Sequence, residues 1–128
     1  MKYNVEYFKD FFGKKDNWTS GTLQSGGNYC ALGHMGFNDE SDAYKSKRAK
    51  ALTEILLWYI RETYGEPALS PTPDCIIPAV NDGANMAIKK KEGPGITYVR
   101  LNDIAEGPKE RIMTILEKAS ELCKTQQK

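Results

Sequence analysis

The chain has 128 residues, of which 40% are hydrophobic and 27% are charged. This composition predicts a single globular domain over residues 1–128 that folds without metals or disulfides, and it excludes a disordered chain or a coiled coil. Lysine and arginine total 18 against 17 acidic residues, so no strong field draws the molecule to nucleic acid or to an anionic membrane. We therefore do not expect nucleic acid as a partner.

The sequence predicts a cytoplasmic protein without membrane contact. The first ten residues are amphipathic and contain acids, unlike a signal peptide. The longest apolar run, residues 55–60, is far too short to span a bilayer. Cys30, Cys75 and Cys123 are an odd number of cysteines at spacings that fit neither a zinc site nor a disulfide framework. We expect reduced thiols, no metal and no cofactor.

The predicted elements begin with a short helix over residues 4–12. Asn4 suits its N-cap, and Phe8, Phe11 and Phe12 recur at helical spacing. We expect these aromatic side chains to enter the core.

Residues 18–38 are rich in glycine, which favours tight turns over long regular elements. Residues 25–28 read Ser-Gly-Gly-Asn and are typical of a hairpin turn. The arm that starts at Tyr29 either continues as a strand or begins a short helix that runs to Met35. The segment is therefore predicted as a glycine-rich hairpin or loop.

A long central helix is predicted over residues 41–64. Ser41 is a good N-cap, and Gly65 stands where a C-cap glycine belongs. Between them, apolar residues repeat at intervals of three and four positions. A buried strand over residues 55–60 is the weaker alternative, because the helical period starts well before that run.

Residues 66–74 contain Pro67, Pro71 and Pro73 and are predicted as a proline-rich internal linker. Further along, residues 96–99 read Ile-Thr-Tyr-Val, which favours a strand, although a short helix has nearly the same support. The choice between strand and helix for residues 96–101 therefore stays open.

The last predicted helix covers residues 108–124. Pro108 suits the first helical position, and one face is apolar. Cys123 lies on that face and is predicted as a core residue, while residues 125–128 are predicted as a frayed tail. Together the elements predict a mainly α fold, with α+β as the alternative.

Cys30 is the candidate nucleophile, because a thiol at the start of a helix has a lowered pKa. Gln24 stands six residues earlier, the spacing at which papain-like enzymes place an oxyanion glutamine. The only histidine, His34, follows Cys30 by four residues, which on a helix places both side chains on one face. Asn81 or Asn102 would orient His34 and complete a Cys, His and Asn set that resembles papain-like sites.

Each of these residues also has a structural interpretation. A buried cysteine behaves as a small hydrophobe, so packing is the default for Cys30. The Asn-Asp pairs at 81–82 and 102–103 occupy positions where side chains cap new turns. Cys30 and His34 lack further ligands with a suitable spacing, so no metal site is predicted.

The glycine-rich segment also carries side chains suited to binding. Its rings can stack on a ligand, although a tryptophan beside a glycine turn usually covers the core. The candidate binding surface consists of Trp18, Gln24, Asn28, Tyr29, His34 and Phe37.

Several landmarks follow one another along the chain: Trp18-Thr19-Ser20-Gly21, Tyr29-Cys30-Ala31-Leu32-Gly33, a central helix, Leu101-Asn102-Asp103 and a closing helix. In this order they resemble an uncharacterised family of small bacterial and phage proteins. That family has a Trp-x-x-Gly turn, an aromatic-Cys-Ala-x-Gly motif and Asn-Asp before its last helix. The chain differs in having His34 and Met35 after the glycine and in its proline-rich linker. The resemblance implies a mainly helical fold and an accessory protein of a phage or mobile element.

We therefore expect a non-enzymatic phage or bacterial accessory protein that binds a host protein or a small ligand, as an inhibitor or a counter-defence factor. A single histidine and the lack of a phosphate-binding glycine motif support this expectation. The alternative is a cysteine-dependent hydrolase or transferase that uses Cys30 as nucleophile, His34 as base and Asn81 or Asn102 as orienting residue.

Overall fold

The computed structural model of the chain describes residues 2–90 and 92–126. The helices are α1 (Val5–Gly13), α2 (Ala31–His34), α3 (Lys47–Thr63), α4 (Pro73–Asp82) and α5 (Pro108–Gln126), with 3-10 turns η1 (Glu40–Lys45) and η2 (Leu101–Asp103). The strands are β1 (Gln24–Ser25), β2 (Asn28–Tyr29), β3 (Gly65–Pro67), β4 (Asn85–Lys90) and β5 (Ile96–Arg100). The fold is mainly helical with small sheets, which confirms the predicted class.

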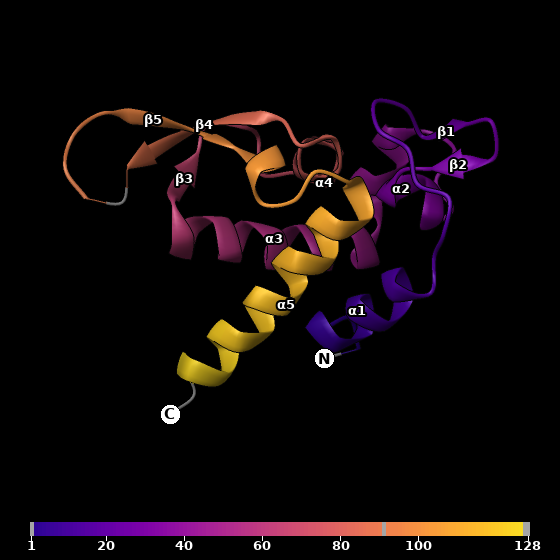
Figure 1. The fold of residues 1–128 in the computed structure, drawn as a ribbon, viewed down its shortest axis with the longest axis horizontal. Helices are drawn as coiled ribbons and strands as arrows, with labels where there is room; N and C mark the ends of the chain where they lie inside the picture. The colour runs from indigo at the N-terminus through magenta and orange to yellow at the C-terminus, as the bar shows by residue number, and fades with distance from the viewer. Residues whose placement is uncertain (1, 91, 127–128) are drawn as a thin grey trace.

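The helix α3 runs through the middle of the molecule, and α5 crosses it (Figure 1). α5 also packs against α1 and α4. The sheet of β3, β4 and β5 lies at one end of the molecule, and the β1–β2 hairpin lies with α2 at the opposite end (Figure 1). No helix within the described residues combines the length and the apolar character needed to cross a membrane.

One buried hydrophobic cluster joins the helices and the larger sheet. Burial of this apolar surface is the main favourable term in folding. The predicted core faces of the first, central and last helices all contribute to it. Its fully buried members include Phe8, Phe12, Leu52, Leu56, Ile60, Ile76, Val80, Ile88, Ile112, Ile115 and Leu116.

The first and last helices begin where the sequence predicts. The Asn4 side chain accepts a hydrogen bond from the N–H of Tyr7 at 2.9 Å, which caps α1. Pro108 is the first residue of α5, where its missing N–H leaves no donor unsatisfied.

The end of α5 differs from the prediction. The helix continues through Gln126, so Thr125 is helical rather than frayed, and residues 127–128 of the predicted tail lie outside the described residues. Cys123 is only half-buried, so the prediction of a core position for it is wrong. Cys123 lines a surface hollow together with Asn4 and Val5 at the start of α1, and this leaves it partly open to solvent.

The predicted helix over residues 41–64 is two elements, η1 and α3. Ser46 stands between them with an extended backbone, and its side chain accepts a hydrogen bond from the N–H of Ala49 at 3.1 Å. Ser41 lies within η1, where its own N–H and hydroxyl donate to Asp39. A serine N-cap requires an extended backbone, so Ser46 rather than Ser41 caps the central helix.

The linker predicted over residues 66–74 is shorter in the structure and covers only residues 68–72. Pro67 ends β3, and Pro73 is the first residue of α4. The first N–H groups of a helix have no partner within the helix, so a proline at the first position costs no hydrogen bond. Pro73 therefore starts a helix rather than extending a loop. Gly83 ends α4 in the left-handed conformation, with φ at 67°.

The strand alternative holds for residues 96–100, while Leu101 begins the turn η2. The sheet has the order β3-β4-β5, and both pairings are antiparallel. Met86 and Ile88 of β4 point to the buried face. β4 thus supplies the hydrogen-bonding partner that selects a strand over a short helix for β5.

Candidate functional site

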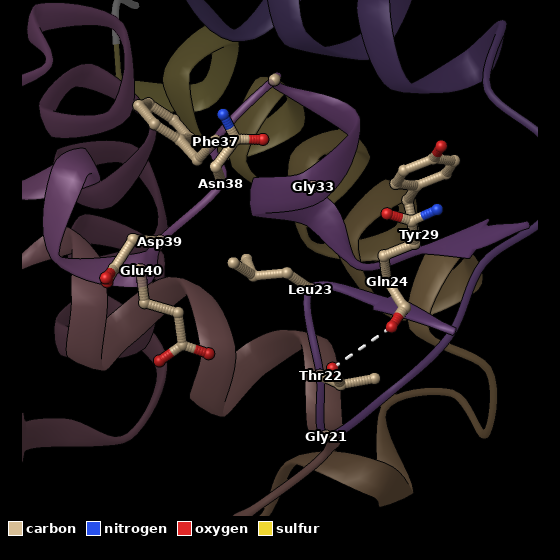
Figure 2. Close-up of a pocket in the computed structure, with 11 residues that line it drawn as sticks. Gly21, Thr22, Leu23, Gln24, Tyr29, Gly33, Phe37, Asn38, Asp39 and Glu40 are labelled. Carbon is tan, nitrogen blue, oxygen red and sulfur yellow. Dashed lines mark hydrogen bonds between the residues drawn. The ribbon is translucent and has the colours of Figure 1, made fainter. Parts of the chain in front are cut away.

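A cleft of about 770 Å³ lies where the β1–β2 hairpin, α2 and residues 36–40 meet (Figure 2). In Figure 2, Leu23 projects from the hairpin arm towards the segment that carries Asp39 and Glu40, and Tyr29 lies on the opposite side. We call this the hairpin cleft. It is lined by Gly21, Thr22, Leu23, Gln24, Tyr29, Gly33, Gly36, Phe37, Asn38, Asp39 and Glu40.

The hairpin forms as residues 25–28 predict. Gly26 and Gly27 have φ values of 54° and 86°, a left-handed pair that a two-residue turn of this kind requires and that glycine adopts without strain. The register pairs Gln24 with Tyr29 and Ser25 with Asn28. After this short strand the chain enters α2, so both sequence alternatives for the second arm occur, one after the other.

The hairpin and α2 touch through their backbones. The N–H of Cys30 donates to the carbonyl oxygen of Leu23 at 3.1 Å. A Cβ atom at Gly33 would run into that same carbonyl oxygen. The glycine of the aromatic-Cys-Ala-x-Gly motif therefore permits the close contact that builds one wall of the cleft.

Cys30 is the N-cap of α2 and is buried. Its Sγ accepts a hydrogen bond from the N–H of Gly33 at 3.5 Å, and its side chain is 6% exposed. Burial raises the pKa of the Cys30 thiol, and the charges of Asp82 and Glu40 raise it further, against the lowering effect of the nearby N–H groups. The neutral thiol is therefore favoured, which is unsuited to a nucleophile.

The imidazole of His34 packs against two aromatic rings. Its centroid lies 4.6 Å from the ring of Trp18 and 5.4 Å from the ring of Tyr29. Its Nε2 is buried and has no hydrogen-bond partner within the described residues. Burial lowers the pKa of His34, and the charge of Lys15 lowers it further. His34 is thus a neutral packing group at neutral pH.

The predicted pair of Cys30 and His34 is not assembled in this structure. No hydrogen bond links the two side chains within the described part of the chain, because the thiol caps α2 and the imidazole lies between Trp18 and Tyr29. A cysteine nucleophile needs a base within hydrogen-bonding reach. Among the same residues there is also no cluster of three histidine, cysteine or acidic side chains that would hold a metal.

Asn81 contacts the backbone around the cleft rather than His34. Its Oδ1 accepts a hydrogen bond from the N–H of Ala31 at 2.9 Å, and its Nδ2 donates to the carbonyl oxygen of Thr19 at 3.0 Å. The neighbouring Asp82 accepts from the N–H of Gly21 at 2.8 Å. This pair anchors the start of α2 and the start of the hairpin arm to α4, which agrees with the capping interpretation.

Asn102 also lies away from His34, because its Oδ1 accepts a hydrogen bond from Nη1 of Arg111 at 2.9 Å. Arg111 is 1% exposed and was not a candidate from the sequence. Its burial could have been predicted from its position in the sequence. Arg111 precedes Ile115 by four residues, so both side chains lie on the buried face of α5. Its guanidinium group links the ends of α4 and η2 to α5.

Of the predicted binding residues, Gln24, Tyr29 and Phe37 line the hairpin cleft. Trp18 lies outside its lining and packs on Phe12, with ring centroids 5.6 Å apart. Its Nε1 donates to the carbonyl oxygen of Lys15, so the indole covers the core as a tryptophan beside a glycine turn usually does.

Asn28 and His34 also lie outside the cleft lining: Asn28 pairs with Ser25 across the hairpin, and His34 lies between two rings. Residues 38–40, which form the opposite wall, were not predicted as part of a site because their sequence indicates only a turn. Their acidic and amide side chains face the hairpin across the cleft, with α2 between the two segments in the sequence.

Comparison of the chain with protein-family models, with curated proteins and with solved structures finds no match.

Proposed function

We propose that this protein is a non-enzymatic accessory protein of phage or bacterial origin that binds a host protein or a small ligand through the hairpin cleft. The observation that carries this proposal is the cleft itself, which is concave and lined by rings, amides and carboxylates from two separate segments. Concave sites with a few convergent polar groups are the usual places for ligands. An inhibitor or counter-defence factor acts by such binding alone.

The lining indicates what the cleft accepts. Tyr29 and Phe37 supply aromatic surface, and the side-chain amides of Gln24 and Asn38 supply both donors and acceptors. The charged lining residues are acidic, and none of the lining residues is lysine, arginine or histidine. A group that donates hydrogen bonds or carries positive charge therefore fits better than an anion.

The two acidic residues have different roles. Asp39 already accepts hydrogen bonds from the N–H and the hydroxyl of Ser41, and these bonds lower the pKa of its carboxyl group. The side chain of Glu40 makes no hydrogen bond or ion pair within the described residues. Its carboxylate is the group that remains available to a partner in the cleft.

The cysteine-dependent alternative lacks comparable support. The thiol of Cys30 is buried and its pKa is raised, and the Nε2 of His34 is buried and forms no hydrogen bond to the thiol or to any other described group. Both side chains contribute to the packing that shapes the cleft. Because the Cys30 thiol and the His34 imidazole are both used in packing, binding has more support than catalysis.

Site-specific photo-cross-linking tests the proposal. A benzophenone amino acid at Gln24, in the cleft, should capture a discrete partner from bacterial lysate, whereas the same group at Lys124, in the last turn of α5, should not. Thr22→Trp, which fills the cleft, should abolish capture and any ligand-induced shift of the melting temperature. Ser70→Trp, at an exposed residue of the 68–72 connection, is the control. Equal capture at both positions, or capture unaffected by Thr22→Trp, would refute binding through the cleft.

A further inference from the structure

One edge of the three-stranded sheet, formed by β5, has unpaired backbone groups. At the two ends of the β4–β5 ladder, Leu101 donates to Ala84 at 3.1 Å and Lys90 donates to Gly95 at 3.3 Å. Hydrogen-bonded pairs alternate along an antiparallel ladder, so every odd-numbered residue of β5 directs its N–H and C=O towards β4.

The even-numbered residues Ile96, Tyr98 and Arg100 therefore direct their N–H and C=O groups away from β4. No backbone hydrogen bond reaches these groups within residues 2–90 and 92–126. Figure 1 shows β5 on the outer side of the sheet, at the end of the molecule away from the hairpin. An exposed row of donors and acceptors is a template for pairing with a further strand.

The opposite edge of the sheet, formed by β3, is closed to such pairing. Ala68 donates to Ala87 at 2.9 Å, so the neighbouring Pro67 directs its backbone outwards. Proline has no N–H to donate, and proline on an edge strand blocks extension of a sheet. β3 also packs on α3. Only the β5 edge of this sheet is open.

Two of the three residues whose backbone faces outwards have large and mostly apolar side chains. Ile96 is 63% exposed and Tyr98 is 73% exposed, and both lie on the face of the sheet opposite to the buried Met86 and Ile88. Arg100 is the one charged residue of β5. Exposed apolar side chains beside unpaired backbone groups mark an interaction surface.

We propose that two copies of this chain associate through their β5 edges, antiparallel about a two-fold axis at Tyr98. In this register Tyr98 lies opposite Tyr98 of the second copy, and Ile96 lies opposite Arg100. All outward groups of the strand are then paired, through about six hydrogen bonds in total, because each bonded pair exchanges two. The two sheets become one continuous sheet.

The charges and the flanking residues favour this partner and this register. Arg100 of one copy lies opposite an apolar residue and diagonal to the Tyr98 ring of the other copy, so its cation meets an aromatic ring rather than a second cation. If the register between the two β5 strands shifts in one direction, Pro94, which has no N–H, has to pair with the strand of the other copy. If it shifts in the other direction, residues of the turn η2 have to pair. Either shift loses hydrogen bonds.

Sedimentation velocity over a range of protein concentrations tests the association. We expect a reversible monomer–dimer equilibrium, because a single strand from each copy forms the interface. Tyr98→Lys places two like charges opposite each other and should raise the dissociation constant by about tenfold or more. Tyr44→Lys changes a tyrosine that is 53% exposed outside the sheet and should leave the constant unchanged.

Cysteine substitutions test the register, since opposite residues in a bonded pair have Cα atoms about 5.5 Å apart, within disulfide range. Tyr98→Cys should form a disulfide-linked dimer under mild oxidation. Ile96→Cys and Arg100→Cys should each form little alone but should cross-link when mixed. Tyr44→Cys controls for the native thiols, and circular dichroism checks that each variant is folded.

A protein that stays monomeric at the highest soluble concentration, with no cross-linking at Tyr98→Cys, would overturn the proposal. A dimer that is insensitive to Tyr98→Lys, or that cross-links equally through Tyr44→Cys, would also overturn it. The β1–β2 hairpin and α2, which contribute to the hairpin cleft, lie at the opposite end of the molecule from β5 (Figure 1), so these outcomes are independent of the proposed function.

Discussion

Nη2 of Arg111 on α5 donates a 2.6 Å hydrogen bond to the carbonyl oxygen of Asn81 at the end of α4. The same guanidinium group also donates to the carbonyl oxygens of Val80, Ala105 and Glu106. Burial lowers the pKa of Arg111, against the opposing charges of nearby acids. A buried cation therefore fixes the end of the helix whose Asn81 side chain holds the hairpin cleft in place.

Replacing Arg111 with methionine should strongly destabilise the protein. The variant leaves several buried carbonyl oxygens without a donor, and each unsatisfied group costs about 1–3 kcal/mol, so we expect a loss of at least about 3 kcal/mol in the free energy of unfolding. Urea denaturation followed by circular dichroism measures it. Lys118→Met, at an exposed position on the same helix, should change stability by less than about 0.5 kcal/mol. Similar values for the two variants would contradict the role given to Arg111.

Two glycine substitutions should act in opposite directions. Gly33→Ala sets a Cβ atom against the carbonyl oxygen of Leu23, and overpacking of this kind costs about 1–3 kcal/mol. Gly13→Ala adds a methyl group at the end of α1, where the nearest atom, from Met113, is 3.7 Å away, and should stabilise the helix by up to about 1 kcal/mol. Thermal unfolding of both variants beside the native protein distinguishes these outcomes. A neutral Gly33→Ala would show that the hairpin and α2 separate without cost.

Protonation of His34 should destabilise the fold. Because burial lowers the pKa of His34 below its ordinary value of 6.5, the unfolded chain takes up the proton first as the pH falls. The stability that His34 contributes is complete above pH 6.5 and is lost as the pH falls through and below this value. Urea unfolding at a series of pH values between 7.5 and 5 should show this loss. His34→Gln should remove that part of the slope, and an unchanged slope would show that another group is responsible.

Cys30 should be the slowest of the three cysteines to react with iodoacetamide at neutral pH. Its thiol is buried and its pKa is raised, whereas Cys75 and Cys123 are half-buried. Mass spectrometry of peptides after timed labelling gives the three rates. Preferential labelling of Cys30 would instead support the cysteine-dependent hydrolase or transferase, with His34 as its base.

Much of the fold follows from local patterns. The Asn4 cap, the Ser-Gly-Gly-Asn turn and Pro108 each specify a boundary through interactions within a few residues, and the structure has all three. The start of the central helix was misassigned because Ser41 and Ser46 are both suitable caps. Only the extended backbone at Ser46 distinguishes them.

The candidate site was only half predictable. Gln24, Tyr29 and Phe37 were proposed because ring and amide side chains in a glycine-rich segment indicate a surface, and the structure places them in the lining of the cleft. The wall of residues 38–40 was missed because no local pattern shows that it faces the hairpin. Asn81 was predicted to orient His34, but its side chain binds the N–H of Ala31, 50 residues earlier in the sequence. A local sequence pattern does not indicate a partner at that distance.

The sequence by itself determined the helical class, the core faces of α1, α3 and α5, and the hairpin, because periodicity, caps and glycine turns act over a few neighbouring residues. The tertiary structure alone decided that Cys30 is a buried cap, that His34 lies between two rings, and that Arg111 is enclosed by carbonyl oxygens. These outcomes depend on burial and on hydrogen bonds between distant segments. Such interactions exist only once the chain has folded.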